Sequence, residues 1–351
     1  MHRLFIALIL LSLTFGSQAA EVDNLYQAST PVSSRDQQER AKLMPQLLQQ
    51  VMLKVVGNQA LLETAPLAPV LSRAEQFMQQ YEYRRTNIIG ADLTQPDELS
   101  LSMRFDPAAV NRAVKELQLP VWGNNRPDIL IWAVVDNNGE ASILGLESSP
   151  MGVFRPLNQA ADQRGLPILL PLMDLQDQGA LSVADIREDN QAAIDAASDR
   201  YGADIVMTSV MQFNGDQVQV QWQANGAGIN TSWQSQGSVR EAFAAGMGHL
   251  ADNLALQFGQ LVDNGSESQR LTMQINDVLS YADFSRLMAY LEKLELISDI
   301  RVINLGAQQL DLDIAFRGSM DVLQKTLAVG SLLIEEPQSE TSDTKQYRLL
   351  H

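Results

Sequence analysis

The sequence contains no cysteine among its 351 residues. Disulfide bonds, a thiol nucleophile and lipid attachment through an N-terminal cysteine are therefore excluded. The absence suits an oxidising compartment, where an unpaired thiol would be a liability.

Basic residues are scarce: 25 lysines and arginines stand against 42 aspartates and glutamates, which gives a formal net charge of −17. A surface this acidic repels phosphate backbones and anionic lipid headgroups, so we do not expect nucleic acid as a partner. Long apolar runs are also missing beyond the N-terminus. None approaches the roughly 18 residues of a membrane-spanning helix, and we expect no transmembrane segment in the mature chain.

The N-terminus has the pattern of a secretory signal peptide. One arginine precedes an apolar run over Leu4–Phe15, and small residues follow. Ser17 and Ala19 satisfy the small-x-small rule, and the apolar run is too short to span a bilayer comfortably. We therefore expect residues 1–19 to be removed by cleavage near Ala19. The remaining length suggests two or three domains.

Residues 20–120 predict an N-terminal α/β domain. A strand over residues 22–32 is followed by Ser34, which with Gln37 has the spacing of a helix capping box. Apolar residues then recur at helical spacing, and Gly57 is placed to end the helix.

The rest of this domain is predicted to contain short elements. Pro45 lies inside the first helix and should kink it. Further along we expect a helix over residues 68–81, strands over 81–89 and 98–105, and a short helix after Pro107.

Residues 121–262 predict a middle mixed α/β domain. Its first residues, WGNNRP at 122–127, have the composition of a connector between a helix and a strand. The continuously apolar stretches 129–135 and 166–173 predict strands covered on both faces. In QVQVQWQA, residues 217–224, apolar residues alternate with glutamines, which predicts a strand with one wet face.

The other elements expected in the middle domain are a hairpin after the turn at residues 136–139, a strand over 203–213, a strand over 231–239, and helices near 157–164, 190–201 and 243–258.

A polar stretch, DNGSESQ at residues 263–269, predicts a linker to a C-terminal domain over 268–351. The order of elements there is β-α-β-β-α-β, the ferredoxin-like split motif. Its last strand could be SLLIEE or the later YRLL. The fold class expected for the chain is therefore α+β or mixed α/β, with three small α/β units.

Four stretches resemble a family of exported Gram-negative bacterial proteins that is classified only as a domain of unknown function. They are LPVWGNNRPDILIWAVVD, QRGLPILLPLMDLQD, AASDRYGADIVMTSVM and the region from Trp222 to Trp233. The WGxxRP and RGLPxxxPLMDLxD strings are specific. The resemblance implies a periplasmic, cell-envelope location and brings no reaction, cofactor or substrate.

The middle domain also resembles the α/β domain at the N-terminus of TolB, on RYGADIVMTSV, the two strands after it and the following helix. Exported lipoproteins of the curli-secretion and penicillin-binding-protein-activator kind share a similar pattern. These relatives act as binding and assembly modules, and such an analogy of fold does not fix function.

Sequence motifs for catalysis are absent. No HExxH, Walker loop, GxGxxG or GxSxG string occurs. His249 is the one histidine between the two chain ends, and we interpret it as a helix-surface residue because no serine or cysteine motif accompanies it. Residues 342–345 formally match SxxK but lie in a polar tail.

Asp174 and Asp177 directly follow an expected buried strand, at the sheet edge where ligands gather in open α/β folds. Two carboxylates three residues apart could hold calcium or magnesium, although such ions usually need about six oxygens. The favoured interpretation is structural: Asp174 caps the following turn or accepts from Arg126 or Arg164. We predict no metal and no cofactor.

The WGNNRP connector is also interpreted as structural. Trp122 has a large apolar area to bury and an N–H to satisfy, and Arg126 can fork onto a carboxylate. Together they predict a clasp that fixes the first domain onto the second.

These patterns favour a non-catalytic periplasmic binding or envelope-assembly accessory protein, whose partner is another periplasmic or envelope protein. The alternative is a metal-assisted periplasmic hydrolase that uses Asp174 and Asp177. A pocket with converging carboxylates would favour the second.

Overall fold

Three β-sheets organise the chain in the computed structural model, which describes residues 24–86, 98–137, 139–146, 151–259, 269–294, 296–329, 332–336 and 344–350. The described residues form eleven α-helices around sheets of three, six and five strands, a mixed α/β architecture. The expected signal peptide, most of the expected linker, and Ser342 lie outside the described residues.

The N-terminal unit is built on an antiparallel sheet in the order β1-β3-β2. Its elements are β1 (Gln27–Pro31), α1 (Gln37–Val56), α2 (Gln59–Thr64), α3 (Ala68–Leu71), a 3-10 turn (Ala74–Phe77), β2 (Met78–Thr86), β3 (Glu98–Phe105) and α4 (Pro107–Glu116). The predicted strands, the first helix and the helix after Pro107 are present.

Two predictions for the N-terminal unit are wrong. Asp36, not Ser34, caps α1, because its carboxylate accepts from the N–H groups of the next turn, while Ser34 binds Glu39 instead. The helix expected over residues 68–81 stops at Leu71; a 3-10 turn follows, and from Met78 the chain is strand β2, where pairing with β3 overrides helical propensity. Helix α1 runs through Pro45 and ends at Gly57, as expected, in the left-handed conformation.

The middle unit contains β4 (Ile129–Asn137), β5 (Glu140–Ile143), α5 (Met151–Arg164), β6 (Ile168–Leu169), α6 (Leu175–Ala180), α7 (Val183–Arg187), α8 (Gln191–Ser198), a 3-10 turn (Asp199–Tyr201), β7 (Ile205–Asn214), β8 (Gln217–Gly226), β9 (Ile229–Ser238) and α9 (Val239–Phe258). The strands lie in the order β5-β4-β7-β8-β9, with β6 also beside β4.

Helices cover both faces of β4, as its continuous apolar sequence predicts. Ile129 and Ile131 pack in one core with α5 and α9, whereas Leu130 and Trp132 pack in a second core with α7 and α8. Successive side chains of β4 point alternately into two buried cores, so neither face of the strand is exposed to solvent.

The strand expected over residues 166–173 is much shorter than predicted. Only Ile168–Leu169 pair with β4, and Leu169 and Leu172 are exposed. Pro167 and Pro171 bracket the pair and cannot donate to a ladder, which limits the strand to two residues. The short helices α2, α6 and α7 were not predicted.

The C-terminal unit contains β10 (Gln269–Asn276), α10 (Tyr281–Lys293), β11 (Ile297–Leu305), β12 (Gln309–Phe316), α11 (Met320–Ala328), β13 (Leu333–Glu335) and β14 (Thr344–Leu349). Its strands lie in the order β11-β12-β10-β14-β13. Both candidates for the last strand are strands: β14 pairs parallel to β10 and separates it from β13.

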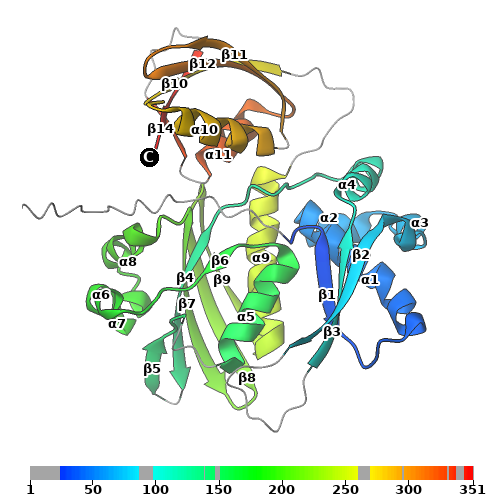
Figure 1. Cartoon of the computed structure of the whole chain (residues 1–351). Helices are drawn as coiled ribbons and strands as arrows, with labels where there is room; N and C mark the ends of the chain where they lie inside the picture. The colour runs from blue at the N-terminus through cyan, green and yellow to red at the C-terminus, as the bar shows by residue number, and fades with distance from the viewer. Residues whose placement is uncertain are drawn as a thin grey trace, which may run out of the picture.

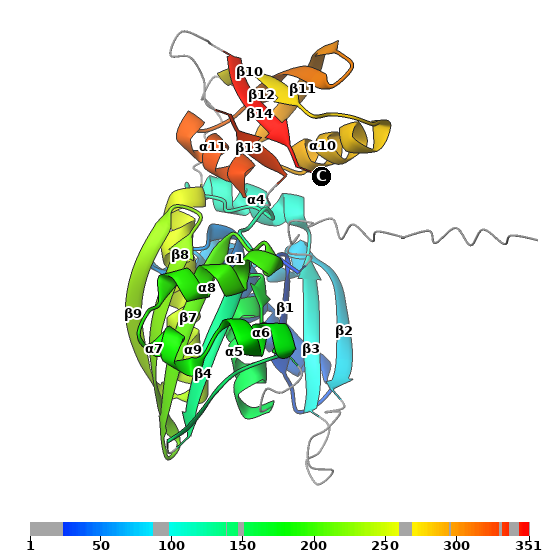
Figure 2. The same ribbon diagram turned by 90° about the vertical axis from the view of Figure 1, so that its left-hand side faces the viewer.

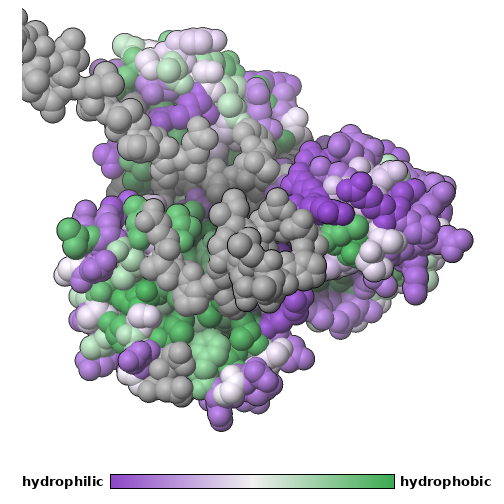
Figure 3. All heavy atoms as spheres, turned by 60° about the horizontal axis from the view of Figure 1, so that its bottom comes forward, coloured by the Kyte–Doolittle hydropathy of each residue, from purple (hydrophilic) through white to green (hydrophobic). Residues whose placement is uncertain are grey.

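The C-terminal unit sits on top of the other two, which lie side by side (Figures 1 and 2). Seen from below, the N-terminal unit is mostly hydrophilic, whereas a broad hydrophobic area covers part of the middle unit (Figure 3). Among the described residues, every helix is too short or too polar to cross a bilayer.

Candidate functional site

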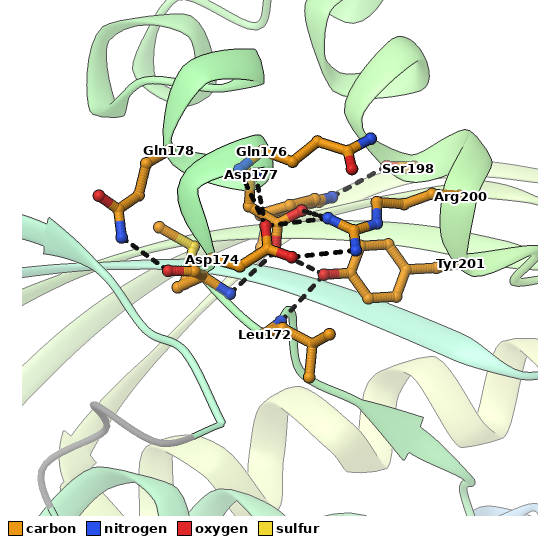
Figure 4. Close-up of polar contacts among 10 residues, drawn as sticks. Leu172, Asp174, Gln176, Asp177, Gln178, Ser198, Arg200 and Tyr201 are labelled. Carbon is orange, nitrogen blue, oxygen red and sulfur yellow. Dashed lines mark hydrogen bonds and ion pairs between the residues drawn. The ribbon is translucent and has the colours of Figure 1, made fainter.

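The two carboxylates singled out in the sequence lie at the start of α6 and are held by a network of hydrogen bonds (Figure 4). Asp174 caps the helix by accepting from the N–H groups of Gln176 and Asp177, both at 3.0 Å. Arg200 forks onto both oxygens of Asp174 at 3.0 Å. Capping is thus present, but the basic partner is Arg200 rather than Arg126 or Arg164.

Asp177 is buried and has partners on both of its carboxylate oxygens. Arg200 donates to Oδ1 at 3.0 Å, and the Tyr201 hydroxyl donates to Oδ2 at 2.6 Å. The N–H of Met173 also donates to Oδ2, at 2.8 Å, and this bond holds Met173 at a φ of 57°. The left-handed turn before Asp174 is therefore stabilised by the second carboxylate.

Electrostatics follow from these contacts. The hydrogen bond from Arg200, followed by the backbone N–H of Asp177, holds the pKa of Asp174 below its usual value. The same pairing raises the pKa of Arg200. Burial, and then the hydrogen bond to Asp177, raise the pKa of Tyr201 to about 12.

This arrangement leaves little capacity for a metal. Calcium and magnesium need about six oxygens, and here the two carboxylates already bind a guanidinium, a phenol and backbone N–H groups. Within the part of the chain that the structure describes, no group of three or more acidic or histidine side chains could hold a metal ion. As it stands, the cluster fixes the turn and anchors α6 to the end of α8.

The connector of residues 122–127 lies where the three units meet. The backbone N–H of Trp122 donates to Val55 O at 2.7 Å, at the C-terminal end of α1. The Asn125 amide donates to Thr326 O of α11 at 3.1 Å. The indole of Trp122, only 1% exposed, stacks on Phe258 at the end of α9, with ring centroids 6.5 Å apart.

Arg126 is completely buried and uses all five of its N–H donors on backbone carbonyl oxygens. The acceptors are Gly123 O (3.1 Å), Arg164 O (2.9 Å), Gly165 O (3.1 Å), Lys54 O and Trp122 O (3.0 Å). The guanidinium also lies 3.9 Å from the centre of the Trp122 ring, a cation–π geometry. One side chain thereby joins α1, the connector and the end of α5.

Helix α1 explains why cations gather here. The last carbonyls of a helix have no partner within it and carry partial negative charge. Arg126 binds the carbonyl of Lys54, and Arg164 binds that of Gly57 at 2.7 Å. The end of α1 is therefore capped by two arginines of the middle unit.

Close packing at this junction depends on two glycines. Gly57 and Gly165 have φ values of 75° and 65°. A Cβ at Gly57 would lie 2.6 Å from the Trp122 ring, and one at Gly165 would lie 2.8 Å from Arg126 Nη1. Any larger residue at either position would displace the groups that join the units.

Several contacts at this junction were not predicted from the sequence. Arg164 also binds Asp252 of α9 at 2.6 Å, and buried Lys54 binds Asp162 at 3.3 Å and Gln27 O at 3.0 Å. Burial lowers the pKa of Lys54. The sequence did contain one indication of these contacts: Lys54 lies within the apolar stripe of α1, and a lysine is rarely buried without partners.

A cavity of about 50 Å³ lies beside the connector. It is lined by the connector, Phe258 and residues of the C-terminal unit, including Arg317 and Thr326. Among the described residues, Trp122 Nε1 and Asn124 Oδ1 are buried without a hydrogen-bond partner.

The remaining candidates do not assemble a catalytic group. His249 is exposed on α9 and lies against Trp233, with ring centroids 4.9 Å apart. Lys345, the described end of the SxxK match, lies in β14 and pairs with Glu335 at 2.8 Å.

Comparisons with known proteins include a family match to part of the chain. A family model described as a domain of unknown function (DUF8605) matches residues 19–123, the N-terminal unit and the first residues of the connector. This agrees with the expected relation to a family of unknown function, over a shorter span than the resemblance suggested. No curated protein matches.

A solved structure of selenomethionine-substituted allophanate hydrolase from Kluyveromyces lactis is similar at 9% identity and a TM-score of 0.17. The alignment covers 78% of this chain and 66% of that one, just under two thirds of its length. A similarity this low supports no conclusion about fold or function.

Proposed function

We propose that this chain is a non-catalytic binding or assembly accessory protein of the bacterial cell envelope, exported to the periplasm with its signal peptide cleaved near Ala19. The connector serves in it as a clasp, in which Trp122 and Arg126 hold the N-terminal unit against the middle unit. The proposal includes a middle unit similar to the TolB N-terminal domain and a C-terminal unit of ferredoxin-like type with one added strand.

The exposed outer face of β8 and β9 is the observation that best supports the binding role. Helices α6–α8 cover this side of the sheet over β4 and β7, but the glutamines of β8 and β9 are exposed. These exposed residues are Gln217, Gln219, Gln221, Gln234 and Gln236. On a chain of net charge −17, an uncharged surface of amide donors and acceptors suits contact with another protein.

A hollow of about 680 Å³ continues this surface at the end of β8, lined mainly by glutamines and Asn214. The alternative, a metal-assisted hydrolase, has weaker support. Its two carboxylates are bound by Arg200 and Tyr201, which would have to move away before a cation could enter.

Site-specific photo-crosslinking in the periplasm tests the binding role. A photoreactive residue at Gln219, on the exposed face of β8, should give a discrete crosslinked product. The same residue at Lys42, exposed on α1, serves as the control and should give none. Mass spectrometry of the purified protein should find Ala20 or Glu21 at its N-terminus.

Two results would contradict the proposal. One is the absence of any product from Gln219. The other is stoichiometric calcium or magnesium binding, measured by calorimetry, that is lost when Asp174 and Asp177 are both replaced by Asn. The second result would favour the hydrolase.

A further inference from the structure

The edge strands of the three sheets differ in how they are protected from pairing with other chains. Natural edges are usually short, charged, interrupted by proline or bulged. Strand β1 contains Pro31, and β5, β6 and β13 have four, two and three residues. The longer β2 and β11 carry charged residues and register shifts.

Strand β9 has none of these protections among the edges that the structure describes. It is ten residues long, INTSWQSQGS, with no charged residue and no proline. Its register with β8 is unbroken from Ile229 to Ser238. Within the described residues no strand pairs with its outer side, so alternate N–H and C=O groups along it point to an open edge (Figure 2).

Helix α9 runs beneath β9 and extends the binding surface beyond it. The Glu241 carboxylate accepts from Ser238, His249 lies against Trp233, and Gln257 donates to Gly228 O, so helix and strand lie together along their whole length.

One stripe of α9 beside this edge is uncovered. Ala245, His249 and Leu256 are exposed, Leu256 by 70%, and their spacing places them on one side of the helix together with Asp252, which binds Arg164; His249 lies against Trp233 of β9. We call Trp233 with the three exposed residues the α9 shelf. A strand added next to β9 would place every second side chain over the α9 shelf.

We propose that the outer edge of β9 binds an extended, basic segment of another protein as an added strand, with its apolar side chains on the α9 shelf. This inference rests on the proposed binding role and identifies its partner class. Backbone hydrogen bonds to β9 would supply affinity, and the α9 shelf would select apolar residues at alternate positions.

Charge favours a basic segment over a second copy of the chain. Each copy carries a formal net charge of −17, so two copies repel, whereas a segment rich in lysine or arginine is attracted. The edge itself is uncharged, so nothing on β9 opposes such a segment.

The test uses a synthetic peptide of about ten residues, alternating valine and threonine between terminal lysines, with binding measured by fluorescence anisotropy. Backbone N-methylation at each position in turn removes one N–H donor. Because alternate N–H groups of a strand face its neighbour, every second methylation should weaken binding about tenfold, and the others by less than about twofold.

Hydrogen exchange and a matched pair of variants locate the site. Peptide binding should protect alternate backbone amides of β9. Gln221 and Gln234 lie opposite each other on the exposed face, in β8 and β9. Gln234→Lys, at the edge, should weaken binding about tenfold, and Gln221→Lys, with the same charge change, by about twofold.

Three results would overturn the inference. The first is no binding by any peptide of the series. The second is binding in which the effect of N-methylation does not alternate from one position to the next; this would contradict strand addition but not the binding role. The third is a dimer in sedimentation velocity that Gln234→Lys dissociates, which would make the occupant a second copy. Failure of the binding role itself would appear separately, as loss of the Gln219 crosslink.

Discussion

Two arginines of the middle unit illustrate different uses of the same side chain. Arg126 is completely buried and binds five neutral carbonyl oxygens, whereas the side chain of Arg200 is 29% exposed and binds two carboxylates. Arg200 joins neighbouring segments within one unit. Arg126 joins three segments from two units.

The difference matters for stability because solvent weakens one set of contacts and not the other. Exposed ion pairs contribute about 0–1 kcal/mol, since water and salt screen them. Removing one partner from a buried polar network leaves the other groups unsatisfied, at about 1–3 kcal/mol each. We therefore expect the connector to matter more for stability than the carboxylate cluster.

The largest effect is expected at Trp122. Replacing Trp122 with Ala removes a buried aromatic ring that stacks on Phe258 and Arg126, and should lower the free energy of unfolding by about 3–5 kcal/mol. Urea denaturation measures this change. Trp122→Phe is the control: its loss should be clearly smaller, because the indole N–H has no partner among the described residues. An unchanged stability in Trp122→Ala would exclude the clasp.

The next largest effect tests whether the C-terminal unit folds independently of the junction. The C-terminal unit has its own core, whose members lie between Leu271 and Leu349. Leu291→Ala, at a fully buried position, should cost about 2–5 kcal/mol and affect chiefly the unfolding of this unit. Exposed Leu256→Ala should change stability by less than about 0.5 kcal/mol. A fragment from residue 268 onward should unfold cooperatively; a disordered fragment would show that its core depends on the middle unit.

The third effect compares the two arginines directly. Arg126→Lys should cost about 2–3 kcal/mol, because lysine has three donors and cannot reproduce the planar fork that reaches five carbonyls. Arg200→Lys should cost clearly less than Arg126→Lys, because its contacts are partly exposed and lysine keeps the positive charge. If thermal and urea unfolding showed the same loss of stability for both variants, burial would not explain the difference expected between the two arginines.

The sequence predicted the elements whose side chains repeat regularly. Strand β8 alternates glutamine with apolar residues, and α9 carries its apolar stripe; both form where expected. The helix over residues 68–81 failed because its last residues, 78–81, pair with β3, whose residues lie more than 20 positions further along the chain and are not part of local propensity.

The candidate site was predictable only in part. Asp174 as a cap follows from its position before α6, but Arg200 follows it by 26 residues and was not identified as its partner. The acceptors of Arg126 are backbone carbonyls, which every residue has, so no residue type marks them in the sequence. Charged residues within apolar stretches, such as Lys54, were the feature of the sequence that could have predicted the junction.

The smallest effect concerns pH at the carboxylate cluster. Folding raises the pKa of Tyr201 from 10.0 to about 12, chiefly through burial and then through the hydrogen bond to Asp177. The stabilisation is therefore complete below pH 10 and is lost as the pH rises to about 12, because the unfolded chain releases the proton first.

Tyr201→Phe removes this dependence, so the difference in unfolding free energy between wild type and variant should shrink over that pH range. Burial also raises the pKa values of Tyr290 and Tyr347, but both are present in the two proteins and cancel in the difference. Urea denaturation at several alkaline pH values measures the change. A difference that stays constant up to about pH 12 would show that folding does not raise the pKa of Tyr201.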